Sequence, residues 1–152
     1  MPRIETSILV NAEIDRVFAL ARDIERYPEF MPDIKSVRIT ERTAERQVSE
    51  WVGLVQAGRV SLEMKWTEDD FWDEATHTCR WRQLKGDFQQ YDGMWTFTPT
   101  ETGTQMSLAI DFRYEVPLVG PLIKSLVNRL MKANAEAILA ALKEQAEKPA
   151  AG

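Results

Sequence analysis

Cysteine and histidine are almost missing from this sequence, which has one of each in 152 residues, Cys79 and His77. A single cysteine cannot form an internal disulfide, so nothing in the chain requires an oxidising compartment. The two residues form an H-x-C pair that offers at most two metal ligands, whereas a zinc site needs three or four. We therefore expect no metal site and no cofactor, and we interpret the pair as part of an ordinary strand.

The short motifs that mark common catalytic and nucleotide-binding sites are missing as well. The sequence has no G-x-G-x-x-G, no phosphate-binding loop and no G-x-S-x-G elbow. Its acidic run at residues 68–74, EDDFWDE, lacks the glycine and the ligand spacing of a calcium loop. We predict that this run is a solvated turn.

Basic residues are outnumbered, and long apolar runs are lacking. The formal net charge is -5, whereas a nucleic-acid binder needs a basic face, so we expect no nucleic-acid partner. No segment approaches the roughly 18 apolar residues of a membrane span, and the first residues lack the pattern of a signal peptide. The expected location is the cytoplasm.

What the sequence does contain is the composition of a folded domain, 44% hydrophobic and 28% charged. Residues 1–148 are predicted to form a single domain, and residues 149–152 a disordered tail. Apolar side chains alternate over residues 3–10, which predicts a strand. They recur every three or four residues over 13–24, which predicts a helix, and the prolines that follow predict a short second helix and a break.

The segment from Ile34 to about Val116 is predicted to consist of strands. Its clearest run alternates apolar and polar residues, which is typical of an antiparallel sheet with one covered face; the apolar members are Met106, Leu108, Ile110, Phe112 and Tyr114. A long helix follows Pro121 and extends to about Lys148. The chain is therefore predicted to be α+β, with two short helices after the first strand and a curved antiparallel sheet of about seven strands around the long helix.

Two stretches resemble a known superfamily. Residues 7–34, SILVNAEIDRVFALARDIERYPEFMPDI, resemble the first strand and helix pair of the START and birch-pollen-allergen (SRPBCC) superfamily. Residues 86–117, GDFQQYDGMWTFTPTETGTQMSLAIDFRYEVP, are similar to the late strands of bacterial polyketide aromatase/cyclases and of ubiquinone-binding START-like proteins. The resemblance implies the helix-grip fold and a lipophilic cavity between the sheet and the C-terminal helix.

The same resemblance implies two functions. The first is that of a carrier or sensor that binds a hydrophobic small molecule, such as a lipid, an isoprenoid or quinone, or an aromatic polyketide. The second is that of a polyketide cyclase or dehydratase, which folds a poly-ketone chain with a few tyrosines and arginines. Alignment on the GRV at residues 58–60 puts Thr67 where the cyclases have a central arginine. Arg80 and Arg82 point to solvent if Trp81 points inward, as we expect. We favour the binding protein and assign no catalytic residue.

Many aromatic and aliphatic side chains either fill the core or line the cavity, and the sequence leaves both roles open for each of them. The candidate ligand-binding residues are Trp51, Trp66, Trp81, Tyr91, Trp95, Phe97, Phe112, Tyr114, Leu122, Leu126 and Leu130. The candidate lid residues are Tyr27, Phe30, Met31, Leu118 and Val119. The apolar residues at the start of the long helix are equally suited to a contact with a membrane surface, and the oligomeric state stays open.

Overall fold

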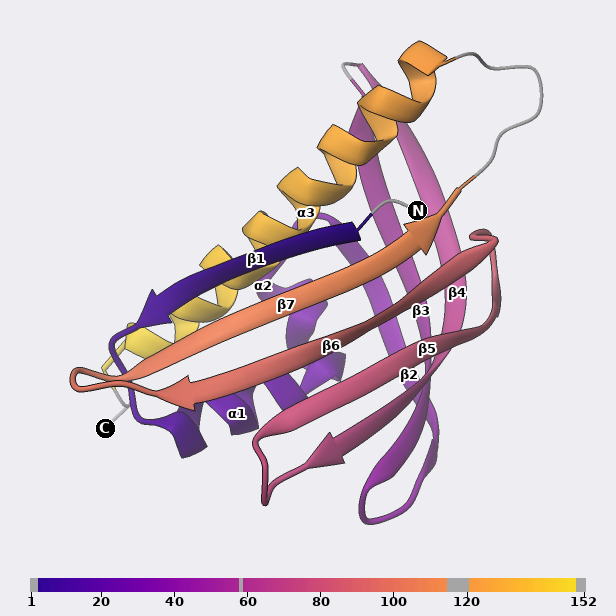
Figure 1. The fold of residues 1–152 in the computed structure, drawn as a ribbon. Helices are drawn as coiled ribbons and strands as arrows, with labels where there is room; N and C mark the ends of the chain where they lie inside the picture. Colours follow the sequence, from indigo (N-terminus) through magenta and orange to yellow (C-terminus); the bar gives the residue numbers. More distant parts are fainter. Residues whose placement is uncertain (1–2, 58, 115–120, 150–152) are drawn as a thin grey trace.

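A single antiparallel sheet of seven strands, ordered β1-β7-β6-β5-β4-β3-β2, forms the frame of this protein in a computed structural model. The structure describes residues 3–57, 59–114 and 121–149. Every neighbouring pair of strands is antiparallel. The sheet curves around the long helix α3, and the short helices lie inside the same curve (Figure 1). The predicted α+β helix-grip architecture is confirmed.

The elements follow the predicted order. They are β1 (Arg3–Val10), α1 (Ile14–Arg22), a short 3-10 turn η1 (Ile24–Arg26), α2 (Tyr27–Phe30), β2 (Ile34–Arg42), β3 (Arg46–Ala57), β4 (Val60–Asp73), β5 (Thr78–Gly86), β6 (Gln90–Pro99), β7 (Thr104–Arg113) and α3 (Pro121–Glu147). Within the described residues, no helix is both long enough and apolar enough to cross a membrane.

The acidic run at residues 68–74 is a strand over most of its length, so the prediction of a solvated turn was wrong. Strand β4 continues through Asp73, and the turn comes only at residues 74–77. Glu68, Asp69 and Asp70 are each at least 95% buried. Because side chains alternate along a strand, Glu68 and Asp70 extend the inward row of Met64 and Trp66. The run therefore brings carboxyl groups into the interior.

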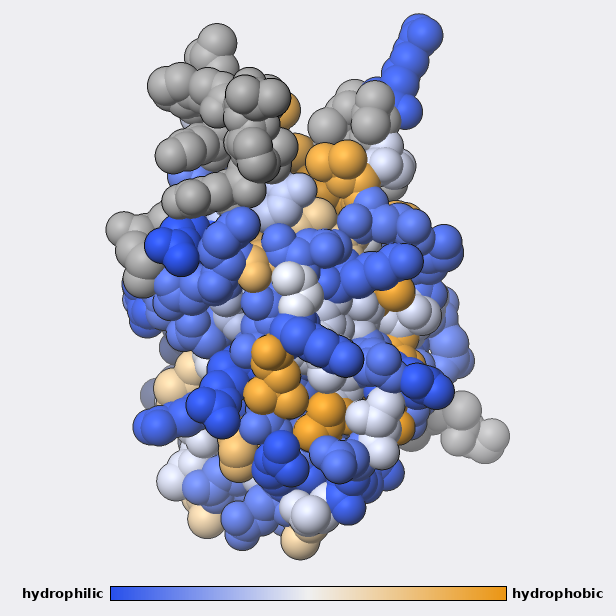
Figure 2. Space-filling model, turned by 90° about the vertical axis from the view of Figure 1, so that its right-hand side faces the viewer, coloured by the Kyte–Doolittle hydropathy of each residue, from blue (hydrophilic) through white to orange (hydrophobic). Residues whose placement is uncertain are grey.

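The convex face of the sheet holds the remaining acid and the arginines. Asp69 points outward, where Arg46 Nε lies 2.6 Å from its Oδ1 and Arg82 Nη2 lies 3.8 Å from its Oδ2. Arg80 is exposed, and Trp81 between the two arginines is buried. The expectation that Trp81 points inward and both arginines outward is confirmed. Figure 2 shows one face of the molecule, on which hydrophilic residues predominate and apolar ones form small groups.

The buried stripe of α3 contains small residues. Its members are Met131, Ala135, Leu139, Leu142 and Ala146, all at most 6% exposed. The alanines allow the helix axis to lie close to β1 and β3, which α3 contacts. The larger Leu126 and Leu130 are half-buried beside this stripe.

The carboxyl end of α3 is held by the beginning of the chain. Arg16 in α1 donates hydrogen bonds of 2.8 Å to the backbone oxygens of Ala146 and Lys148. The backbone N–H of Asn11 donates another, also of 2.8 Å, to Glu147. The two bonds from Arg16 satisfy backbone carbonyl groups of the kind that the end of a helix leaves without partners, and the bond from Asn11 holds the side chain of Glu147.

Candidate functional site

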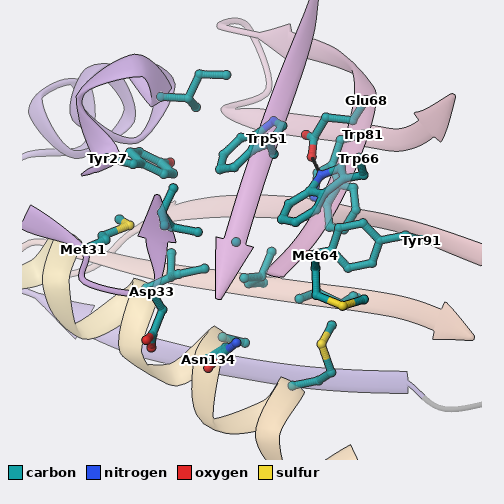
Figure 3. A pocket seen from close by; sticks show the side chains of 18 of the residues that line it. Tyr27, Met31, Asp33, Trp51, Met64, Trp66, Glu68, Trp81, Tyr91 and Asn134 are labelled. Carbon is teal, nitrogen blue, oxygen red and sulfur yellow. Dashed lines mark hydrogen bonds between the residues drawn. The ribbon is translucent and has the colours of Figure 1, made fainter. Parts of the chain in front are cut away.

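A cavity of about 100 Å³ lies between the concave face of the sheet and α3. The strands β3, β4, β5 and β6 supply most of its wall, α2 closes one side, and Asn134, Ala135 and Ile138 contribute from α3. Figure 3 shows labelled aromatic side chains from α2 and the strands surrounding this space, with Asn134 on the helix beneath. A space of this size is of the order of the roughly 150 Å³ engineered cavity that admits benzene.

Aromatic rings in mutual contact form the wall. Trp51 and Trp66 are stacked, with ring centres 5.6 Å apart and planes within 9°. Tyr27 meets the edge of Trp51 at 5.7 Å. Tyr91 lies 5.2 Å from Trp66 and 4.5 Å from Trp81. Rings in such contact present a continuous apolar surface and restrict one another's rotation.

One of these rings lies close to the backbone because a glycine allows it. A Cβ atom on Gly93 would be 2.5 Å from Trp81 Cζ2 and 2.4 Å from the backbone oxygen of Ala109. Gly93 pairs directly with Trp81 across β5 and β6. The missing side chain therefore makes room for the indole to lie against β6.

A chain of hydrogen bonds joins the two stacked indoles through buried polar groups. Trp51 Nε1 donates to Ser49 Oγ over 2.8 Å, and Ser49 Oγ donates to Asp70 Oδ2 over 2.6 Å. Asp70 is hydrogen-bonded to Glu68, whose Oε1 accepts from Trp66 Nε1 over 2.7 Å. We refer to Glu68 and Asp70 as the acid pair. Both of its members line the cavity.

Burial favours the protonated form of both members of the acid pair. Burial raises the pKa of Glu68 well above its ordinary value, and the charge of Asp70 and the hydrogen bond between the two raise it further. Burial also raises the pKa of Asp70, but hydrogen bonds from Glu68 and Ser49 act in the opposite direction. Burial and the neighbouring carboxyl therefore both favour a proton on Glu68, because two adjacent buried carboxylates repel each other.

Two buried donors near the acid pair have no hydrogen-bond partner. They are Trp72 Nε1 and Gln47 Nε2. Trp72 follows Asp70 by two residues on the same face of β4 and lines the cavity, while Gln47 is paired with Asp70 across the sheet. Buried donors nearly always have a partner in folded proteins, so a polar atom from outside the chain is expected to complete this region.

The described residues that line the cavity include no lysine, arginine or histidine. They do include the acid pair and Asp33, which is half-buried at the side near α3. The remaining lining residues are mostly aliphatic or aromatic. The polar groups of the cavity wall are therefore mainly carboxyl groups, with no basic side chain among the described lining residues.

The structure brings together only part of the candidate ligand-binding set. Trp51, Trp66, Trp81, Tyr91 and Trp95 line the cavity, as do the candidate lid residues Tyr27 and Met31. Tyr27 is fully buried, and its hydroxyl donates to the backbone oxygen of Ala21 over 2.5 Å, so it lies in the core of the wall.

The other candidates lie elsewhere. Phe97 and Phe112 are buried in the core, Tyr114 and Phe30 are half-buried against it, and Leu126 and Leu130 are half-buried on α3. Leu118 and Val119 lie outside the described residues, and the structure gives no side-chain description of Leu122. The roles of these residues as ligand contacts or lid stay predictions.

Sequence reasoning missed the polar part of the wall. Glu68, Asp70 and Trp72 were not among the candidates, nor was Ser49, which is hydrogen-bonded to Asp70 behind them. The apolar Phe88, which stacks on Tyr91 at 4.3 Å, was missed as well. A signal was present for β4, since the alternation of Met64 and Trp66 continues through Glu68, Asp70 and Trp72.

Comparison with known proteins places this site in context. The family described as polyketide cyclase / dehydrase and lipid transport matches residues 1–147. The crystal structure of TTHA0849 from Thermus thermophilus is similar, with a TM-score of 0.87 at 30% identity, covering 95% of this chain and 97% of that one. The Zhui aromatase/cyclase from Streptomyces sp. R1128 has the same fold, with a TM-score of 0.88 at 23% identity over 99% and 97% of the two chains.

A curated relative carries a different name. The ribosome association toxin RatA of Escherichia coli K12 is 24% identical over 132 residues, which is 87% of this chain and 78% of that protein. The START-like resemblance drawn from the sequence is confirmed by the family match and by the shared fold.

Proposed function

Because the chain belongs to the polyketide cyclase / dehydrase and lipid transport family, we propose that it binds a hydrophobic small molecule in the cavity between the sheet and α3. The ligand is a lipid, an isoprenoid or quinone, or an aromatic polyketide, and the protein acts as its carrier or sensor. The observation that carries this proposal is the wall of contacting aromatic rings around an interior space of about 100 Å³.

The energetics favour modest affinity. Removing about 300 Å² of apolar surface from water contributes near 7 kcal/mol, at roughly 25 cal/mol per Å². The loss of translational and rotational freedom on association offsets part of this gain, which leaves micromolar or weaker binding. The present cavity holds about one aromatic ring, so a larger ligand requires lining side chains to move apart.

Extraction of the purified protein, followed by mass analysis of what it releases, tests the proposal directly. A hydrophobic molecule at near one equivalent supports it. Native mass spectrometry with added quinone, isoprenoid and aromatic compounds extends the test to protein that is purified without a bound ligand. Failure of all three classes to bind at millimolar concentration contradicts the proposal.

A matched pair of variants ties binding to this cavity. Ala137 lines the cavity but is exposed, so Ala137→Trp places an indole at the mouth without entering the core. Ala133 is exposed on the same helix and does not line the cavity. We expect Ala137→Trp to weaken binding at least tenfold and Ala133→Trp to leave it unchanged, since only the first competes with the ligand for space.

A cyclase or dehydratase is the second candidate function, and the acid pair favours it. A buried carboxyl with a raised pKa, beside a carboxylate and near Tyr91, has the composition of a proton donor and acceptor for an enolising ketone. Incubation with a reactive poly-β-ketone tests this function. An unchanged distribution of cyclised products, compared with buffer alone, contradicts it.

Ribosome association appears in the name of the curated relative, and one property of this chain argues against it here. The net charge of -5 opposes binding to an RNA-rich surface. We expect the protein to stay in the supernatant when ribosomes are pelleted at low salt. Cosedimentation at that salt concentration contradicts this expectation.

A further inference from the structure

The polar end of the cavity combines acceptors with one free donor. The acid pair supplies carboxyl oxygens. Trp72 lies two residues further along the same face of β4, and its indole N–H is buried without a partner. Trp72 is 3% exposed and Asp70 is 3% exposed, so bulk water does not satisfy either group. Glu68, Asp70 and Trp72 all line the cavity, so the acceptors and the donor border the same space.

From this arrangement we infer that the cavity selects an apolar ligand with an uncharged hydroxyl head, which donates to the acid pair and accepts from Trp72 Nε1. This inference rests on the proposed function and specifies the chemical class of its ligand. A phenolic or alcoholic hydroxyl has one donor and two acceptor sites, so a single oxygen complements both protein groups.

The charges around the site exclude the alternative heads. A carboxylate or phosphate meets the negative acid pair and Asp33 with no basic side chain among the described lining residues. An ammonium group is attracted to the acid pair but cannot accept a hydrogen bond, so it leaves Trp72 Nε1 unpaired. A purely apolar ligand leaves Trp72 Nε1 unpaired.

Three other titratable groups that interact with Glu68 add no charge of their own to the site. Tyr27 from α2, Cys79 from β5 and Tyr91 from β6 all interact electrostatically with Glu68. Burial is the main cause that raises the pKa of each of them, so all are uncharged at neutral pH. The carboxyl groups of the acid pair and of Asp33 are consequently the acidic groups that border the cavity.

A series of ligands with one aromatic body tests the inference. The probes are p-cresol, p-xylene and p-toluate, which differ only in a hydroxyl, a methyl and a carboxylate, titrated by calorimetry at pH 7. We expect p-cresol to bind roughly tenfold more tightly than p-xylene, because a site built to pair a hydroxyl discriminates against analogues that lack it. We expect p-toluate to bind more weakly than either.

The outcomes separate this inference from the function on which it rests. Equal or tighter binding of p-xylene overturns the hydroxyl inference and leaves a hydrophobic site in place. Tightest binding of p-toluate also overturns it, since an anion would then be the preferred head. If none of the three binds, both the inference and the proposal of an internal hydrophobic site fail for ligands of this size.

A variant of the free donor gives an independent readout. Trp72→Phe keeps a ring and removes the N–H, so it is expected to lower the p-cresol to p-xylene affinity ratio about fivefold to tenfold. Trp95→Phe, in the same wall on β6, is the matched control and is expected to preserve the ratio. Thermal unfolding of both variants shows whether each remains folded.

A crystal structure with bound p-cresol supplies the final check. We expect the phenol oxygen within hydrogen-bond distance of Glu68 or Asp70 and of Trp72 Nε1. A water molecule that occupies this position and stays there when p-cresol is bound elsewhere in the cavity overturns the inference, because water then completes the donor. An unchanged affinity ratio in Trp72→Phe leads to the same conclusion.

Discussion

Trp66 Nε1 donates a 2.7 Å hydrogen bond to Glu68, two residues further along the same strand. The ring of Trp66 faces the cavity as apolar wall while its one polar atom is held by a buried acid. The apolar surface and the acid pair are therefore parts of one structure, and a change in either affects the other.

Glu68→Gln is expected to flatten the pH dependence of stability. The folded state keeps the proton of Glu68 at pH values where the unfolded carboxyl, with a pKa of about 4.3, has lost it. The free energy of unfolding of the natural protein therefore falls as the pH rises above this value, by up to about 1.4 kcal/mol per pH unit for one proton. Urea unfolding between pH 5 and 8 measures the slope.

Glu63→Gln is the control for this measurement. Glu63 is exposed, and its hydrogen bond with Lys35 lowers its pKa, so it does not titrate above pH 5. Its substitution is expected to leave the slope unchanged. A slope in Glu68→Gln as steep as in the natural protein would show that the acid pair does not hold a proton.

Ser49→Ala is expected to destabilise the fold by about 1–3 kcal/mol, because it leaves buried partners without hydrogen bonds. Ser49 is completely buried and links the indole of Trp51 to Asp70. Chemical denaturation measures the loss. Ser36→Ala, at an exposed position of β2, is the control, with an expected change within about 0.5 kcal/mol. Equal effects of the two substitutions would contradict a special role for Ser49.

Gly93→Ala is expected to displace the indole of Trp81 and to cost about 1–3 kcal/mol of stability, as overpacked sites do. The new methyl group would lie 2.5 Å from the Trp81 ring. Near-ultraviolet circular dichroism measures the change in the environment of the Trp81 ring, and thermal unfolding measures the change in stability. Gly53→Ala, whose contacts with Trp66 begin at 3.2 Å, is expected to have the smaller effect. The reverse order would contradict the packing described for β6.

Arg46→Met is expected to lower stability by roughly 1–3 kcal/mol, because it leaves the buried Asp69 with only the more distant Arg82 as a partner. This range already allows for the partial exposure of Arg46, which weakens the ion pair. Arg80→Met on the same convex face is expected to change stability by less than about 0.5 kcal/mol. Neither substitution is expected to alter ligand affinity, since both arginines lie outside the cavity. A loss of binding in Arg80→Met would contradict this expectation and would support the hypothesis of a cyclase that depends on an arginine.

The sequence allowed the element order and the direction of Trp81 to be predicted, because periodicity and strand parity are local properties. The acidic run at 68–74 was wrongly predicted to be a turn because its high charge is typical of solvated loops. The alternation of inward-facing residues that begins at Met64 and Trp66 continues through this run. Its burial depends on a partner strand that supplies Ser49 and on the indole of Trp66. Such pairing across strands is not visible in the order of residues along one strand.

The wall of the cavity was predicted only in part for a similar reason. Trp51 and Trp66 are distant from Trp81 and Tyr91 in sequence, and their common location follows from the curvature of the sheet. Leu122, Leu126 and Leu130 were favoured as lining residues, whereas the described α3 residues that line the cavity lie further along the helix and are Met131, Asn134, Ala135, Ala137 and Ile138. Which residues approach a space depends on how closely the helix lies to the sheet, and small residues decide that distance.

The hydrogen bonds from Arg16 and Asn11 to the carboxyl end of α3 affect how the protein folds during its synthesis. Strand β1 pairs with β7, which is made about a hundred residues later, and Arg16 finds its acceptors only when residues 146 and 148 have been translated. The first segment to be synthesised therefore cannot complete its native contacts until the last segment has been made. Such long-range pairing slows folding and leaves apolar strands exposed meanwhile, so production of this protein at the ribosome is a period of vulnerability to aggregation.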